Sequence, residues 1–279
     1  MNVSIVIPVY NEAERLGACL AAIDAQTIRP YEVIVVDNNS SDGTAAVATQ
    51  FPFVRLLQER RQGVVHARTT GFDAAGGDII ARIDADTLLP PDWSAQMLQI
   101  MADTQLAAVS GAPHYYDFAI PALADRIDHY WRQRLADKLA ADNFLYGANM
   151  AIRRSAWLTV RRELCAVAGL HEDFDLAIHL QAHGFRVVYD ASLIASVSSR
   201  RIDTNLADYI RYTLVSPRTY ARHRLRSRRH MYPVLLISWL CHLPGRVLYR
   251  AYNPHTQTFS VGQLLVASQA RPDPTSHVA

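Results

Sequence analysis

Runs of branched apolar residues alternate with segments whose apolar residues recur at helical spacing along the first part of the chain. The run VSIVIPV predicts a buried strand over residues 3–9, and Leu16, Leu20 and Ile23 mark a helix over residues 14–26. The same alternation predicts strands at 32–36, 53–57 and 78–83 and helices at 44–50 and 64–75. Such regular alternation is typical of a mostly parallel sheet with helices on both faces, so we expect an α/β, Rossmann-like fold.

The pattern continues less regularly as far as residue 190. Helices are predicted at 93–101, 121–141 and 171–184, and strands at 106–110 and 144–152. Gly147 lies near the middle of the last of these strands, where a glycine often marks close approach of the backbone to a ligand.

Composition adds bounds to this picture. Half of the 279 residues are hydrophobic and 19% are charged, which allows a sizeable core. The three cysteines, Cys19, Cys165 and Cys241, are far apart, so we expect a reducing compartment rather than a disulfide framework. The N-terminal run lacks the order of a signal peptide, and the apolar stretch 234–243 is shorter than the ~20 residues that span a bilayer.

Polar side chains collect where three of the predicted strands end. Asn11 and Glu12 follow the first strand, residues 37–42 follow the second, and Asp84 and Asp86 follow the fourth. Ligands bind beyond these ends in parallel sheets. Because side chains alternate along a strand, we expect Asp84 and Asp86 to point the same way, and paired carboxylates suit Mg²⁺ or Mn²⁺ shared with substrate phosphates. The alternative is a solvated turn, where aspartate is common.

Six segments stand in the order found in glycosyltransferase family 2, which the chain resembles from Asn2 to Asp190. They are SIVIPVYNE, VIVVDNNSSDGT, ARTTGF, DADT, YGANMAI and HEDFDLAIHLQAHGFRVVYD. Neither GxxxxGK[ST] nor GxGxxG occurs, which argues against ordinary NTPase and dinucleotide sites. The resemblance implies a GT-A fold, a nucleotide-sugar donor, transfer with inversion and a divalent metal cofactor, Mn²⁺ or Mg²⁺. It also implies a catalytic domain, which we place over residues 1–200. The basic and apolar pattern that follows predicts a helical extension over 201–269, and we expect the polar tail 270–279 to be disordered.

The resemblance gives each matching position a role. Asp37 would accept a hydrogen bond from the nucleotide base, Asp84 would bind ribose or sugar, and Asp86 would bind the metal. Asp42 would lie beside Asp37 or cap the next helix, and Arg68 would approach the diphosphate or the acids of the site, unless it is an ordinary surface helix residue. The other donor-binding positions implied are Pro8, Tyr10, Glu12 and Ala85, and those bordering the acceptor pocket are Gly147, Ala148 and Asn149.

The acidic pair of the family falls on Glu172 and Asp173, at the start of a predicted helix. The resemblance implies that Asp173 is the general base. Glu172 is the competing candidate, and helix capping is the alternative use, because acids are favoured at a helix N-terminus. Inversion by single displacement needs a carboxylate that takes the acceptor proton and a separate electrophile that holds the leaving diphosphate.

Three further patterns narrow the expectation. No QxxRW motif occurs, which favours addition of one or a few sugars over polymerisation. The run SVSSRR lacks the His that many relatives place before an Arg, so diphosphate contact by Arg200 or Arg201 stays open. The spacing of the histidines at 66, 171, 179 and 183 does not indicate a metal cluster.

The segment from Arg218 to Leu243 joins a basic run to an apolar one, and residues 200–250 hold eleven Arg and two acids. A solvated helix face is one interpretation. A surface for anionic lipid headgroups or a lipid-linked phosphate is the other, since a basic patch beside an apolar segment suits a membrane. No recognised nucleic-acid module is present, so we expect no nucleic-acid partner.

The sequence therefore predicts an inverting, metal-dependent, non-processive glycosyltransferase that moves a hexose or N-acetylhexosamine to a saccharide or lipid-linked acceptor. A UDP-sugar is the favoured donor because of Asp37, with GDP-mannose as the other candidate. We expect a cytoplasmic protein, peripheral at the inner face of the plasma membrane. The alternatives are a non-catalytic nucleotide-sugar-binding protein of the same fold and a nucleotidyltransferase, whose glycine-rich N-terminal loop is missing from VIPVYNEAERLG. The oligomeric state is left open.

Overall fold

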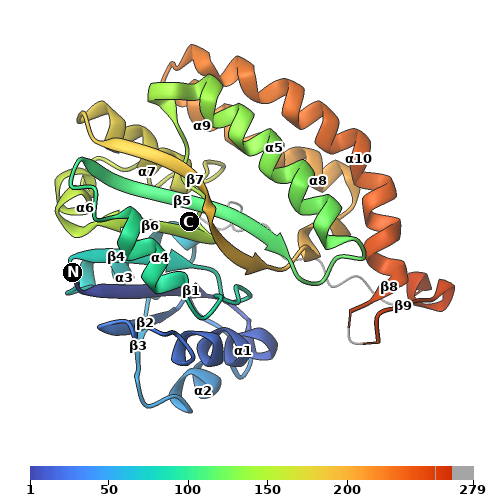
Figure 1. Cartoon of the computed structure of the whole chain (residues 1–279), viewed down its shortest axis with the longest axis horizontal. Coiled ribbons are helices and arrows are strands. Elements are labelled where there is room, and N and C mark those ends of the chain that lie inside the picture. The colour runs from blue at the N-terminus through green and yellow to red at the C-terminus, as the bar shows by residue number, and fades with distance from the viewer. Residues whose placement is uncertain (255, 266–279) are drawn as a thin grey trace.

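The computed structural model describes residues 1–254 and 256–265. Within these residues, seven strands form one sheet in the order β3-β2-β1-β4-β6-β5-β7 (Figure 1). The strands are β1 (Val3–Val9), β2 (Glu32–Asp37), β3 (Val54–Gln58), β4 (Ile79–Ile83), β5 (Leu106–Tyr115), β6 (Asn149–Arg153) and β7 (Arg186–Val197). Only β6 runs antiparallel to its neighbours in this sheet, so the prediction of a mostly parallel sheet is confirmed. The predicted disordered tail, 270–279, lies outside the described residues.

Helices cover both faces of this sheet. They are α1 (Ala13–Asp24), α2 (Thr44–Thr49), α3 (Val64–Ala74), α4 (Trp93–Ile100), α5 (Pro121–Leu139), α6 (Arg154–Val160), α7 (Glu172–Ala182), α8 (Leu206–Thr213), α9 (Val215–Arg222) and α10 (Met231–Ala251). Ile5 and Ile7 of β1 pack in one core cluster with α1 and α4, whereas Val6 packs in a second cluster with α3, α6 and α7. Each fully buried aliphatic side chain of this kind contributes about 1.5–3 kcal/mol. Strand β1 is buried on both faces for this reason, as its continuous apolar run predicts.

A third core cluster lies over the far end of the sheet, where β5 and β7 pair. It joins Ala112 and Tyr189 of these strands to Leu139 of α5 and Tyr220 of α9. The C-terminal helices α8, α9 and α10 thus pack against the sheet domain through α5 and α7, and Figure 1 shows α5 and α10 side by side. The expected C-terminal helical extension is present.

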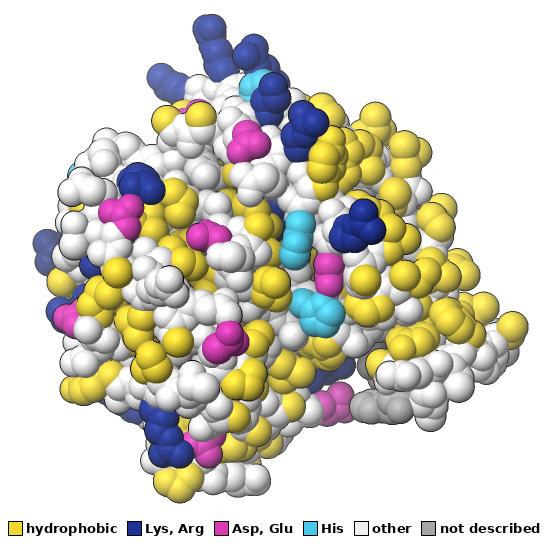
Figure 2. Space-filling model, viewed as in Figure 1, with side chains coloured by type: hydrophobic (Ala, Val, Ile, Leu, Met, Phe, Trp, Pro, Cys, Tyr) yellow, Lys and Arg dark blue, Asp and Glu magenta, His cyan; other side chains and the backbone are white. Residues whose placement is uncertain are grey.

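Helix α10 turns a polar face inward and an apolar face outward. On the inner face, Arg246 and Arg250 pair with the buried Asp203 of the short 3₁₀ helix η2 (Arg200–Asp203). On the outer face, Leu236, Leu240 and Leu243 and their neighbours are exposed, with Leu240 at 70%. Figure 2 shows hydrophobic side chains gathered over this side of the molecule, with Lys and Arg side chains at its upper end.

The apolar run predicted from the sequence, 234–243, stops before Pro244, whereas α10 continues through this proline to Ala251. By length and composition alone, one helix among the described residues, Arg226–Ala251, could cross a membrane, and only 17% of its most apolar window is buried.

Two expectations at the ends of strands were wrong, and both bear on the site. Strand β4 ends at Ile83, so Asp84 and Asp86 lie in the turn that follows and strand alternation does not orient them. Strand β6 begins at Asn149, so Gly147 lies in the turn before it rather than in the middle of a strand. Strand β4 ends where its apolar run ends, whereas the apolar residues 144–148 made β6 look longer in sequence than it is.

Candidate active site

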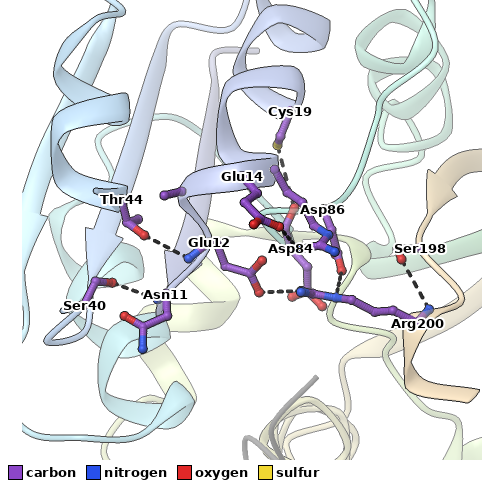
Figure 3. A network of polar contacts seen from close by, with 12 residues as sticks. Asn11, Glu12, Glu14, Cys19, Ser40, Thr44, Asp84, Asp86, Ser198 and Arg200 are labelled. Atoms are coloured by element: carbon purple, nitrogen blue, oxygen red, sulfur yellow. Dashed lines mark hydrogen bonds and ion pairs between the residues drawn. The ribbon is translucent and has the colours of Figure 1, made fainter. Parts of the chain in front are cut away.

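The loops that follow β1 and β2 are tied together at one edge of the sheet. Val9 at the end of β1 pairs with Asp37 at the end of β2, which brings the two loops side by side. The Asn11 amide donates to Ser40 Oγ at 3.0 Å (Figure 3). The Ser41 amide donates to Asn11 Oδ1 at 2.8 Å. Asn11 adopts a left-handed conformation, φ 54°, which asparagine tolerates better than most residues. These bonds give the rim a defined shape.

Asp42 caps two helices at this rim. Its carboxylate accepts hydrogen bonds from the backbone amides of Ala13, at 3.1 Å, and Thr44, at 2.9 Å, at the starts of α1 and α2. Burial raises the pKa of Asp42, but the hydrogen bonds from Thr44 and Ala13 outweigh it and hold the pKa below its ordinary value. The helix-capping role, one of the two predicted for Asp42, is therefore what the structure shows. Thr44 Oγ1 in turn accepts from the Glu12 amide at 2.8 Å, which fixes the start of the Glu12 side chain.

Glu12 and Asp86 converge on the guanidinium of Arg200. Arg200 Nε donates to Asp86 Oδ2 at 2.9 Å, and its Nη2 pairs with Glu12 Oε1 (Figure 3). All three residues are buried, with exposures of 4–5%. Two buried carboxylates around one guanidinium leave a net negative charge and a set of hard oxygen donors. Such a set fits a divalent cation, which Arg200 would have to leave room for.

A second charged cluster links the end of β4 to the start of α7. The Glu172 carboxylate pairs with Arg82 Nη1 at 2.6 Å and with Arg68 Nη1 at 2.8 Å, and Arg82 Nη2 also reaches Asp84 Oδ1 at 3.3 Å. Burial raises the pKa of Glu172, while Arg82 and Arg68 oppose that rise. Arg68 is 1% exposed and lies over the Trp157 ring, so the alternative of a surface helix residue is wrong.

Asp173 lies beside this cluster but is held differently. Its carboxylate accepts from the backbone amides of Gly147 and Phe174, each at 2.9 Å, and it is only half-buried. Burial raises the pKa of Asp173, against opposing effects of Arg82 and of the two amides. Of the two adjacent carboxylates, Glu172 is engaged by two guanidinium groups, whereas Asp173 is held by backbone amides.

Position 147 requires a glycine because the Arg82 guanidinium occupies the space that a side chain would need. A Cβ atom built on Gly147 would lie 1.7 Å from Arg82 Nη1 and 2.5 Å from Arg82 Cζ. The close approach expected at this glycine is therefore that of the Arg82 guanidinium.

The other predicted positions divide between the rim and the interior. Asp37, at the end of β2, is 6% exposed and accepts from the Ser40 amide at 3.2 Å, while Tyr10 is 37% exposed. Pro8 lies within β1, and Ala85 packs in the first core cluster. Ala148 is also buried, and its carbonyl accepts from Thr87 Oγ1.

Asn149 is fully buried, and its side-chain amide forms hydrogen bonds with strands β5 and β7 of the sheet. Its Nδ2 donates to the carbonyls of Ala112 and Leu193, and its Oδ1 accepts from Trp93 Nε1. A place for Asn149 at the acceptor pocket stays a prediction, and the hydrogen bonds give the side chain a structural task.

Two site residues were missed or left open by the sequence. Arg82 was given no role, although a single charge inside the apolar run IIARI indicates a buried ion pair. Arg200 was left open, and its partners Glu12 and Asp86 lie 188 and 114 residues away along the chain. Only the folded chain shows that these three meet.

Solved structures define the class of fold. A mannosyltransferase from Pyrobaculum calidifontis, in complex with GDP-Man and Mn²⁺, superposes with a TM-score of 0.65 at 22% identity, covering 94% of this chain and 77% of its own. Glucosyl-3-phosphoglycerate synthase from Mycobacterium tuberculosis, with Mn²⁺ and UDP-glucose, gives 0.55 at 17% identity over 80% of each chain. The fold is the GT-A fold of glycosyltransferases, as expected from the resemblance.

The family is shown by sequence. The chain belongs to glycosyl transferase family 2, whose profile matches residues 4–161. Glycosyltransferase AglE of Haloferax volcanii is 33% identical over 162 residues, 54% of this chain and 52% of the relative. The undecaprenyl-phosphate 4-deoxy-4-formamido-L-arabinose transferase of Serratia proteamaculans is 34% identical over 141 residues, 47% of this chain and 40% of that protein. The match thus spans about half, or less, of the length of these curated relatives.

Proposed function

We propose that this chain is an inverting, metal-dependent glycosyltransferase that moves a hexose or N-acetylhexosamine from a nucleotide-sugar to a saccharide or lipid-linked acceptor. One observation carries the proposal. The half-buried Asp173 is held by backbone amides, whereas the buried carboxylates of Glu12 and Asp86 form a separate cluster around the Arg200 guanidinium. Inverting transfer needs this division between a base and an electrophilic site.

Asp173 is the better candidate for the general base. A base must accept a proton, and the Glu172 carboxylate is already paired with two guanidinium groups. The amides of Gly147 and Phe174 orient Asp173, and the raised pKa makes its carboxylate more basic than an ordinary aspartate. Arg82 opposes that rise in pKa and so favours the ionised carboxylate, the form that would take a proton from the acceptor hydroxyl.

The leaving diphosphate would be held at the other cluster. Asp86 and Glu12 would hold a divalent ion, and an ion there would neutralise the negative charge that develops on the leaving phosphate. The Arg200 guanidinium is well suited to contact the same phosphates, because a guanidinium can donate two parallel hydrogen bonds to phosphate oxygens. Donor binding would then exchange the carboxylate partners of Arg200 for phosphate.

The donor is proposed to be a UDP-sugar, because Asp37 stands at the end of β2 where the family reads the base. The Pyrobaculum mannosyltransferase was solved with GDP-Man and the Mycobacterium synthase with UDP-glucose, so both nucleotides are tested below.

A non-catalytic nucleotide-sugar-binding protein of the same fold is the competing proposal. The experiment that separates the two measures binding and slow hydrolysis for a panel of UDP- and GDP-sugars, with Mn²⁺ or with chelator. Wild type is compared with Asp86→Ala and Asp173→Asn. We expect one donor to be hydrolysed only with metal, Asp86→Ala to lose donor binding, and Asp173→Asn to bind but turn over about 10²–10⁴-fold more slowly.

Other outcomes decide against the proposal. Donor binding without hydrolysis or transfer in wild type would favour the non-catalytic protein. Absence of binding for every nucleotide-sugar would contradict the donor site itself.

We also propose that the acceptor is lipid-linked and that α5 and α10 lie on the membrane surface. The exposed apolar residues on these helices are Leu123, Ile127, Tyr130, Tyr232, Leu236, Leu240, Leu243, Val247 and Leu248. The exposed basic residues Arg222, Arg224, Arg226, Arg228 and Arg229 adjoin this apolar face (Figure 2). A basic end beside an apolar stripe is complementary to an anionic lipid surface.

Helix α10 is better suited to lie on a membrane than to cross it. Its inner face is tied to the protein by the pairs of Arg246 and Arg250 with Asp203, and Ser238 contacts Tyr209 Oη at 2.6 Å. Crossing would require these groups to separate. The Serratia relative is named as an undecaprenyl-phosphate sugar transferase, which agrees with a lipid-linked substrate.

Sedimentation with phosphatidylglycerol vesicles tests this surface. Leu236→Asp with Leu240→Asp is expected to lower vesicle binding at least about tenfold, because each charge would have to leave water. The matched control, Tyr31→Asp with Ile28→Asp, changes exposed apolar residues near β2, far along the sheet from β7. Equal vesicle binding by both variants and wild type would contradict the proposed surface.

A further inference from the structure

Four side chains that the proposed reaction does not use meet between α7 and the end of α9. Asp175 and His179 lie on α7, Cys165 precedes this helix, and His223 directly follows α9. One potential ligand atom from each lies within 4.8 Å of the other three. Residues from three separate segments thus present a thiol, a carboxylate and two imidazoles to one point.

Asp175 is the centre of the group and is 1% exposed. Its Oδ1 contacts His223 Nε2 at 2.7 Å and lies 3.7 Å from His179 Nε2, and its Oδ2 accepts from the Cys165 amide at 2.8 Å. The carboxylate therefore fixes both the segment before α7 and the end of α9.

His179 supplies a separate observation that points to a ligand. Its Nε2 is fully shielded from solvent and has no hydrogen-bond partner among the described residues. An imidazole nitrogen buried in this way is costly unless something binds it. The other ring nitrogen, Nδ1, lies 3.8 Å from Glu163 Oε2, and a carboxylate beside the non-ligating nitrogen is the usual outer partner of a metal-binding histidine.

We propose that Cys165, Asp175, His179 and His223 form a site for a divalent transition-metal ion, with Zn²⁺ as the best match. Mixed sulfur, nitrogen and oxygen ligands suit Zn²⁺, whereas Mg²⁺ and Ca²⁺ prefer oxygen alone. Two ligands at about 2.1 Å from an ion in tetrahedral geometry are about 3.4 Å apart. The 3.7 Å between His179 and Asp175 agrees with this spacing, and the His223–Asp175 contact would open by several tenths of an ångström. On binding, the Cys165 thiol would release its proton to solvent and coordinate as the thiolate.

The ion would join the C-terminal extension to the helix that begins with Glu172 and Asp173. Helices α7 and α9 already contact each other through the His171 amide, which donates to Thr219 Oγ1 at 3.0 Å. At the end of α9, an ion bound by His223, Asp175 and His179 would strengthen the connection that the His223–Asp175 contact already makes. The site is therefore structural, and its test does not depend on glycosyl transfer.

The test measures Zn²⁺ binding to the purified chain after chelator treatment, by competition with a chromophoric chelator, and records the absorption spectrum of the Co²⁺ form. Every measurement is repeated with Asp86→Ala, which removes one of the two proposed metal ligands of the donor site. Cys165→Ser and His223→Gln remove one ligand each, and the glutamine keeps a hydrogen-bond donor toward Asp175. Cys241→Ser is the matched control, since this cysteine is exposed on α10. Circular dichroism confirms that each variant is folded.

We expect one Zn²⁺ per chain in wild type and in Asp86→Ala, and a Co²⁺ form with thiolate charge-transfer absorption. Cys165→Ser should lose that absorption, and both ligand variants should bind Zn²⁺ at least about tenfold more weakly, while Cys241→Ser should match wild type. Failure of wild type to bind Zn²⁺ stoichiometrically, or binding unchanged in both ligand variants, would overturn the site and leave a hydrogen-bonded cluster only. The Co²⁺ spectrum of wild type decides the question even if a variant fails to fold.

Discussion

Replacing Gly147 with alanine adds one atom, the Cβ, which should displace the Arg82 guanidinium. The φ angle of Gly147 lies outside the left-handed region, so alanine is not excluded by the backbone. The obstacle is Arg82, whose Nη1 would lie 1.7 Å from the new Cβ, where ordinary contacts begin at 3.4 Å. The guanidinium must therefore move by about 1.7 Å. It cannot do so freely, because it is buried and paired with Glu172 at 2.6 Å and with Asp84 at 3.3 Å.

The size of the effect follows from these contacts. Overpacking of a tight site costs about 1–3 kcal/mol, and a shift of this length also separates Arg82 from Glu172. At about 2–4 °C per kcal/mol for a domain of this size, we expect Tm to fall by about 2–12 °C. Arg82 also opposes the raised pKa of Asp173, so its withdrawal should raise that pKa further and move the acid limb of the pH–rate profile upward.

The assays are thermal unfolding and the pH dependence of donor hydrolysis. Gly17→Ala is the matched control, because the nearest atom to its Cβ, Val47 Cγ1, is 3.7 Å away and alanine stabilises a helix by about 0.5–1 kcal/mol relative to glycine. If Gly147→Ala showed the Tm, the turnover and the acid limb of wild type, the reasoning that Arg82 fills this space would be refuted.

Three further changes test other parts of the site. The pKa of Asp173 is raised in the folded protein, so kcat should rise with pH through a midpoint above about 3.9, the pKa of an ordinary aspartate. The Asp173→Asn variant should lack this rise. A midpoint at or below about 3.9 in wild type would contradict the assignment of Asp173 as the base. Asp42→Ala should lower the free energy of unfolding by about 0.5–2 kcal/mol through loss of two helix caps, measured by urea unfolding, and its donor affinity should change little. Arg200→Ala should leave the Glu12 and Asp86 carboxylates buried together without a cation. In the absence of metal, the free energy of unfolding should fall by about 3–5 kcal/mol. Mn²⁺ should then raise the Tm of this variant more than that of wild type, and an equal rise in both proteins would argue against a metal at these carboxylates.

Much of the sheet could be predicted because each strand carries its own signal. β1, β2 and β4 are short runs of branched apolar residues closed by polar loops, and their predicted limits differ from the structure by a residue or less. The acids at their ends were found for the same reason. Local sequence determines a strand that is buried on both faces.

Other features depend on the packing of distant segments. Nothing near Arg200 in sequence indicates Glu12, and the spacing of His179 does not show that Cys165 and His223 come beside it. Gly147 was interpreted as a strand glycine because FLYGANMAI is mostly apolar, whereas β6 begins only at Asn149 and the Arg82 guanidinium lies against Gly147. Buried charges form their pairs across the fold, so a pattern along the chain shows the charge but not its partner.

The short helix η2, Arg200–Asp203, links the proposed donor site to helix α10. Its first residue, Arg200, pairs with Glu12 and Asp86 of the proposed donor site, and its last residue, Asp203, pairs with Arg246 and Arg250 of α10. A movement of Arg200 toward phosphate would shift the same turn that carries Asp203. Thermodynamic linkage then requires reciprocity: if a lipid surface changes the affinity for the donor, the donor changes the affinity for the surface by the same factor. If donor and lipid bind as proposed, this one turn of 3₁₀ helix is the segment through which the two binding equilibria would be coupled.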